Sequence, residues 1–212
     1  TAPDIQLQEW LHLMDPENPL AKVIHMTLER LKIISPPPMK IEISSTIPIA
    51  SGMGSSAAIS IVVIRALCHF LNSPLPPEEQ SQIAFEIEKL HHGTPSGVDN
   101  TVIAFGKPVF FRHGEDPKPF EVGAPLTLII ADSGSSSLTS DVVGQVREGW
   151  INDQASYEAI FSQIGSITHR AQQAIKSGQI HVLGSLMNHN QEYLRTLKVS
   201  SPELENLIRV AL

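Results

Sequence analysis

A glycine-containing segment between a strand-like stretch and a helix-like stretch most constrains how this chain can fold. Residues 39–43 alternate apolar and polar side chains and predict a short strand. The apolar run 59–67 predicts a buried helix. The segment that joins them reads Pro48-Ile49-Ala50-Ser51-Gly52-Met53-Gly54-Ser55-Ser56-Ala57-Ala58.

A strand, a glycine loop and a helix start, in this order, favour binding of an anion. Glycines let the backbone approach the ligand, the first helical N–H groups point at it, and the helix dipole favours its charge. We therefore predict a phosphate cradle that consists of Ala50, Ser51, Gly52, Met53, Gly54, Ser55 and Ser56. The alternative is ordinary turn and capping chemistry, because the segment has neither the lysine of a Walker loop nor a Gly-X-Gly-X-X-Gly pattern.

Two later blocks accompany the glycine segment. One reads His92-Gly93-Thr94-Pro95-Ser96-Gly97-Val98-Asp99-Asn100, and the other runs from Ala131-Asp132-Ser133-Gly134 to Leu138-Thr139. Together the three blocks resemble the GHMP kinase family of galactokinases and homoserine, mevalonate and phosphomevalonate kinases. The glycine segment is similar to its second signature, with Met53 where leucine is commoner. The two later blocks are most similar to their counterparts in the mevalonate kinase branch of the family.

The resemblance implies an α+β fold of the GHMP kinase type. Its N-terminal domain, similar to ribosomal protein S5, would span residues 1–131, and 132–212 would begin a mostly helical C-terminal α+β domain. The sequence pattern agrees with mixed structure, because it predicts helices over 20–32 and 78–91 and from 139 onward, with breaks at 176–178 and 200–202. It also predicts strands over 109–111 and 126–131.

The family's site residues map onto a small set of positions. By resemblance Asp99 is the catalytic residue that removes or orients the proton of the acceptor hydroxyl, while Ser96 and Thr139 join it in contacting the substrate. Ser56 and Glu88 match the residues that bind Mg²⁺, which prefers hard oxygen ligands. Each residue also has an ordinary interpretation: an Asx turn for Asp99, a turn cap for Ser96, a helix N-cap for Thr139, and a solvated helix charge for Glu88.

The function implied is ATP- and Mg²⁺-dependent phosphorylation of mevalonate to 5-phosphomevalonate, a step of isoprenoid precursor biosynthesis. Two alternatives stay open: another GHMP kinase, such as a phosphomevalonate kinase, and a GHMP-fold protein that binds a ligand without catalysis. The presence of Ser56, Glu88 and Asp99 together favours an enzyme. The first and third signatures of the family are not found in these residues, so we interpret the sequence as part of a longer kinase.

Composition excludes several other classes of protein. The net charge of −7 and the lack of a basic run argue against a nucleic-acid partner. The single cysteine, Cys68, permits no internal disulfide and lies in an apolar run typical of a core. Adjacent His91 and His92 have no further ligand at metal-binding spacing. We expect a cytoplasmic enzyme without a membrane span, and the resemblance is compatible with a homodimer.

Overall fold

The computed structural model describes residues 1–2, 7–47, 52–92, 95–133 and 139–212. The chain divides into two compact units, Thr1–Pro119 and Phe120–Leu212, which are described separately. The domain boundary expected after residue 131 lies beyond this division at Pro119, and it stays a prediction. Among the described residues, no helix has both the length and the apolar character needed to cross a bilayer.

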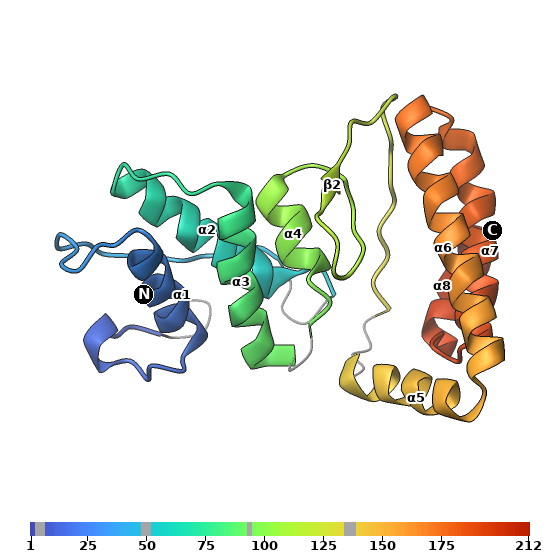
Figure 1. Cartoon of the computed structure of the whole chain (residues 1–212), viewed down its shortest axis with the longest axis horizontal. Coiled ribbons are helices and arrows are strands. Elements are labelled where there is room, and N and C mark those ends of the chain that lie inside the picture. Colours follow the sequence, from blue (N-terminus) through green and yellow to red (C-terminus); the bar gives the residue numbers. More distant parts are fainter. Residues whose placement is uncertain (3–6, 48–51, 93–94, 134–138) are drawn as a thin grey trace. The chain divides into compact units, whose positions relative to one another are not determined.

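The first unit is built from four α-helices, drawn in blue to green in Figure 1. They are α1 (Pro19–Arg30), α2 (Ser55–Phe70), α3 (Pro77–His92) and α4 (Val98–Phe105), with a short 3₁₀ helix, η2 (Leu11–Leu13), before them. The expected helix starts are confirmed: the side chain of Asn18 accepts the Leu20 N–H at 2.9 Å, and Pro19 occupies the first turn of α1.

One apolar core joins α1, α2, α3 and α4. Its buried members are Val23, Ile24, Leu28, Ile61, Val63, Ile64, Leu67, Cys68, Ile83, Ala84, Ile87 and Ala104. Cys68 is thus a core residue, as expected, and burial raises the pKa of its thiol. Because α2 contributes the largest share of this core, the helix that follows the predicted phosphate loop is rigidly held.

The strand predicted over residues 39–43 is not formed. The segment is extended, and its apolar side chains Met39, Ile41 and Ile43 lie against the core, so the alternation was interpreted correctly. A ladder is missing, however. Among the described residues its backbone bonds only to Thr1, whose ammonium donates to Ile41 O at 2.6 Å and whose carbonyl accepts from Ile43 N–H at 2.9 Å. Two bonds to one residue do not make a strand.

The first unit also contains a two-stranded antiparallel ribbon. β1 (Val109–Phe110) pairs with β2 (Lys118–Pro119), with Val109 opposite Pro119. β1 confirms the strand predicted over 109–111. The strand predicted over 126–131 was wrong: those residues form no ladder within the described chain, and Ile129 is 96% exposed. An apolar, β-branched run favours a strand only where a partner strand lies beside it.

The second unit is helical from Thr139 onward, as predicted. It comprises α5 (Thr139–Asn152), α6 (Gln154–Ser177), η3 (Ile180–Val182), α7 (Leu183–Thr196) and α8 (Pro202–Ala211). Both expected breaks are confirmed. Gly178 ends α6 in the left-handed region at φ 73°, and the side chain of Ser201 caps α8 by accepting the Leu204 N–H. In Figure 1, α6 and α7 lie side by side.

The backbone of the segment after Phe120 passes close to the backbone at the end of α6. The Gly123 N–H donates to Ile175 O at 2.9 Å. A Cβ at Gly123 would lie 2.3 Å from Lys176 O, which is closer than any real Cβ contact. Glycine is therefore required at this position by the close approach of the two chain segments.

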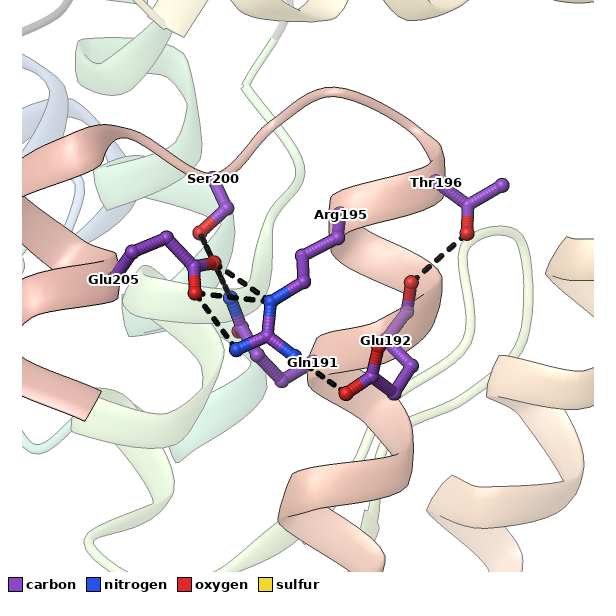
Figure 2. Close-up of polar contacts among 6 residues, drawn as sticks. All are labelled: Gln191, Glu192, Arg195, Thr196, Ser200 and Glu205. Carbon is purple, nitrogen blue, oxygen red and sulfur yellow. Dashed lines mark hydrogen bonds and ion pairs between the residues drawn. The ribbon is translucent and has the colours of Figure 1, made fainter. Parts of the chain in front are cut away.

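A polar cluster joins α7 to α8 (Figure 2). The guanidinium of Arg195 donates to both carboxylate oxygens of Glu205 at 2.7–2.9 Å and also pairs with Glu192. Glu205 accepts further hydrogen bonds from Ser200 Oγ at 2.6 Å and Gln191 Nε2 at 3.0 Å. These donors lower the pKa of Glu205 to about 2, with the Arg195 bonds as the largest cause.

This cluster predicts how the stability of the second unit depends on pH. The folded-state pKa of Glu205 is depressed, so its contribution is fully present above about pH 4.5 and is lost as the pH falls toward 2. We expect Glu205→Gln to melt at a lower temperature than the wild type at pH 7, with the difference shrinking between pH 5 and pH 2. Thermal unfolding followed by circular dichroism across that range measures this, and a constant difference would contradict it.

Candidate functional site

The predicted phosphate loop leads directly into α2. Gly52 and Gly54 have φ angles of 72° and 67°, a conformation that glycine adopts without strain, and Met53 between them is half exposed. The first bond of the helix runs from Ala58 N–H to Gly54 O at 2.9 Å. The N–H groups of residues 55–57 precede it and point away from the helix toward its N-terminal end. Ala50 and Ser51 of the predicted cradle lie outside the described residues.

Asp99 lies beside this loop. A Cβ at Gly54 would be 3.5 Å from both Cβ and Cγ of Asp99, and 3.5 Å from Cδ1 of Ile103. The carboxylate is exposed and therefore accessible to a ligand. The structure thus brings together two residues from blocks that are far apart in the sequence.

The local structure around Asp99 is the start of a helix, which the sequence pattern did not predict. Asp99 occupies the first turn of α4, which begins after Gly97 at φ 86° and ends at Gly106 at φ 62°. Glycines at both ends in left-handed conformation delimit this short helix. A helix start gives Asp99 a more defined direction than a loop would, and an acidic residue there is favoured by the helix dipole.

Glu88 lies on α3, near the start of α4. A Cβ at Gly97 would be 3.4 Å from Cε2 of Phe85, which places the beginning of α4 against that ring. Glu88 follows Phe85 by one helical turn, and it is only 5% exposed. The interpretation as a solvated surface charge is therefore wrong. Burial of a carboxylate is favourable where a cation offsets its desolvation.

The donor set fits a magnesium ion. Ser56, in the first turn of α2, supplies a hydroxyl, and Glu88 supplies a carboxylate, both of them hard oxygen ligands. Mg²⁺ usually retains several waters and needs only one or two protein ligands. Among the described residues there is no group of three or more His, Cys, Asp or Glu that would form an all-protein metal cage. The metal-binding role of Ser56 and Glu88 remains a prediction.

Ser96 and Thr139 are the other predicted substrate residues. Ser96 is exposed, and its Oγ accepts the Val98 N–H at 3.3 Å, the turn-capping role that was the alternative for it. It also lines a shallow pocket of about 190 Å³ with Phe85 and Phe111, whereas Asp99 is not among the lining residues. Thr139 is the first residue of α5 in the second unit. Substrate contacts by Ser96 and Thr139 remain predictions.

Sequence reasoning missed the polar contacts that hold α4. Asn100 and Thr101 bond to Ser81 of α3, and Arg65 of α2 bonds to the carbonyl oxygens of Ile103 and Ala104. One signal was present: Arg65 is the only charged residue in the apolar run 59–67, and a charged side chain there needs a partner nearby.

A glycine loop at a helix start, an exposed aspartate beside it and a buried glutamate on a helix that packs against α4 are features expected of a small-molecule kinase. Residues 18–107 match the family model of the GHMP kinases N terminal domain, so the chain contains a domain of this family. Its relatives include mevalonate kinases. That of Aeropyrum pernix is 35% identical over 174 residues, and that of Pyrococcus horikoshii is 32% identical over 177 residues.

These matches cover 81% of this chain but only 53% and 52% of the two relatives, so the chain spans about half their length. Solved structures show the same fold. Methanococcus jannaschii mevalonate kinase matches 99% of this chain and 68% of its own, with a TM-score of 0.76 at 24% identity. The L. major mevalonate kinase in complex with R-mevalonate matches 92% of this chain and 61% of its own, with a TM-score of 0.67 at 26% identity. The α+β GHMP fold is thereby confirmed.

Proposed function

We propose that the protein containing this chain phosphorylates mevalonate to 5-phosphomevalonate with MgATP. The observation that carries the proposal is the close approach of the predicted catalytic residue to the predicted phosphate loop, since a Cβ at Gly54 would lie 3.5 Å from Cβ and Cγ of Asp99. The similarity to mevalonate kinases of two archaeal species, and to a structure solved with R-mevalonate, supports the choice of substrate.

The geometry suits phosphoryl transfer, which depends on positioning and charge neutralisation. The N–H groups at the start of α2 would hold the phosphate oxygens of ATP. Asp99, exposed beside Gly54, would accept or orient the proton of the attacking hydroxyl at the edge of that phosphate site. Magnesium held by Ser56 and Glu88 would supply charge neutralisation at the phosphates.

The test is an assay of the whole protein with three acceptors. ADP release is measured with mevalonate, phosphomevalonate and galactose at equal concentrations, with and without Mg²⁺. Preference for mevalonate, dependent on Mg²⁺, is expected. If phosphomevalonate or galactose is preferred, the protein is still a kinase, but the assignment of mevalonate as its substrate is wrong. Nucleotide binding without turnover of any acceptor would favour a ligand-binding protein of this fold.

Thr139 provides a prediction about the acceptor. If its hydroxyl contacts mevalonate, Thr139→Ala should raise the KM for mevalonate roughly three- to tenfold, the usual effect of one lost hydrogen bond, with the KM for ATP unchanged. Thr139→Ser, which keeps the hydroxyl, is the control and should stay near the wild-type value. A lowered melting temperature with an unchanged KM would instead show that Thr139 serves only to stabilise the first turn of α5.

A further inference from the structure

We propose that Asn100 is a positioning residue for Asp99. Its hydrogen bonds to α3 set the rotation of α4 about its own axis, and that rotation directs Asp99 toward Gly54. The catalytic consequence of this inference rests on the proposed function, whereas its structural part does not depend on the substrate.

Asn100 belongs to a buried polar cluster between α3 and α4. Its Nδ2 donates to the backbone carbonyl of Ser81 at 3.1 Å and lies 2.9 Å from Ser81 Oγ, which is 3.3 Å from Thr101 Oγ1. Thr101 Oγ1 donates to Gly97 O at 2.6 Å. Asn100, Thr101 and Ser81 are 4%, 3% and 8% exposed, respectively. Any other rotation of α4 would leave these buried groups without partners, which is costly.

The cluster and the catalytic residue lie on different stripes of the same helix. Asn100 and Ala104, four residues apart, form the buried stripe, at 4% and 1% exposure. Asp99 and Ile103, also four residues apart, form the stripe that meets Gly54. Successive residues of an α-helix differ by about 100° in direction. Fixing Asn100 on Ser81 therefore fixes the direction of Asp99.

α4 depends on such contacts because it is short. A helix of eight residues is marginal in isolation, so its orientation comes from tertiary interactions. Arg65 holds the far end, with Nη2 donating to Ala104 O at 2.7 Å and to Ile103 O at 3.2 Å, and Nε donating to Gln80 of α3. Those bonds secure the last turn, and the Asn100 cluster secures the turn that carries Asp99.

The first experiment is a double-mutant cycle in the whole protein with mevalonate and MgATP. Asn100→Ala should lower kcat roughly 10- to 100-fold, as expected for a small misplacement of a catalytic group, with the KM for MgATP unchanged. In the Asp99→Asn background the same substitution should lower kcat less than about twofold, because Asn100 acts through Asp99. Equal losses in both backgrounds would overturn the proposal.

A matched pair of threonines separates positioning from general destabilisation. Thr27 and Thr101 are both buried, and the hydroxyl of each donates at 2.6 Å to a carbonyl four residues earlier. Thr27 lies in α1, away from Asp99. We expect Thr27→Val and Thr101→Val to lower the melting temperature similarly, with kcat reduced only in Thr101→Val. Equal reductions of kcat would overturn the proposal.

Amide hydrogen exchange gives a readout that needs no turnover. Asn100→Ala should accelerate exchange in α4 while α1 stays protected. If Asn100→Ala does not fold, Ser81→Ala is used in its place, because it removes one hydrogen-bond partner of Asn100. If the wild type does not phosphorylate mevalonate, the proposed function fails, and accelerated exchange confined to α4 still supports the role of Asn100. Unchanged exchange in α4 would overturn it.

Discussion

Replacing Asp99 with asparagine is expected to lower kcat about 10²–10⁴-fold, the usual effect of removing a general base, while nucleotide affinity stays near the wild-type value. The separation of the two effects follows from the structure. The Asp99 carboxylate is exposed beside Gly54, at the edge of the phosphate loop, whereas the N–H groups predicted to hold the phosphates belong to α2. Asparagine keeps the size of the side chain but cannot accept the proton.

The measurement combines steady-state turnover of mevalonate with calorimetric titration of MgATP. Asp116→Asn is the matched control, because it makes the same substitution on an exposed residue of the loop that joins β1 and β2. It should leave both quantities unchanged. Near-normal turnover by Asp99→Asn would remove Asp99 from the mechanism, and an equal loss of nucleotide affinity would assign it to the phosphates instead.

Glu88→Gln is expected to weaken binding of MgATP about 10- to 100-fold, the range typical of residues that support a metal site. The reason is the loss of a charged ligand at a position that is only 5% exposed. Affinity for ATP measured in the absence of Mg²⁺ should change little, because the predicted phosphate contacts are backbone N–H groups at the start of α2. Calorimetry with and without Mg²⁺ separates the two contributions.

A matched control for this substitution lies on the same helix. Glu86 is exposed and forms a surface ion pair with Lys89 at 2.6 Å, which contributes little to stability. Glu86→Gln should bind MgATP as the wild type does. If Glu88→Gln and Glu86→Gln behave alike, or if Glu88→Gln loses affinity equally with and without Mg²⁺, Glu88 does not bind the metal.

Local patterns predicted the helices well and the strands poorly. α1, α2 and α3 have regular apolar spacing and clear start signals such as Asn18-Pro19, and those signals act over a few residues. The segments 39–43 and 126–131 have strand-like side chains, but a strand also needs a partner, which a local pattern does not contain. α4 was missed because Gly97 and Gly106 delimit it so closely that it looked like a turn.

In the candidate site, too, the sequence indicated which residues matter but not how they are arranged. The resemblance to a kinase family, carried by the three sequence blocks, was needed to select Ser56, Glu88 and Asp99, and their roles stay predictions. Their arrangement was not predictable, because the approach of Asp99 to Gly54 depends on how α2 and α4 pack against α3. The Ser81–Asn100 bonds that orient α4 join two helices through ordinary polar residues, for which no local pattern exists.

The close approach at Gly123 has a consequence for the order in which the second unit folds. Its N–H donates to Ile175, far along the chain, and a long loop must close before that bond can form. α6, by contrast, can form from contacts within its own sequence, which makes its formation fast. The segment around Gly123 therefore docks late, onto an α6 that is already complete.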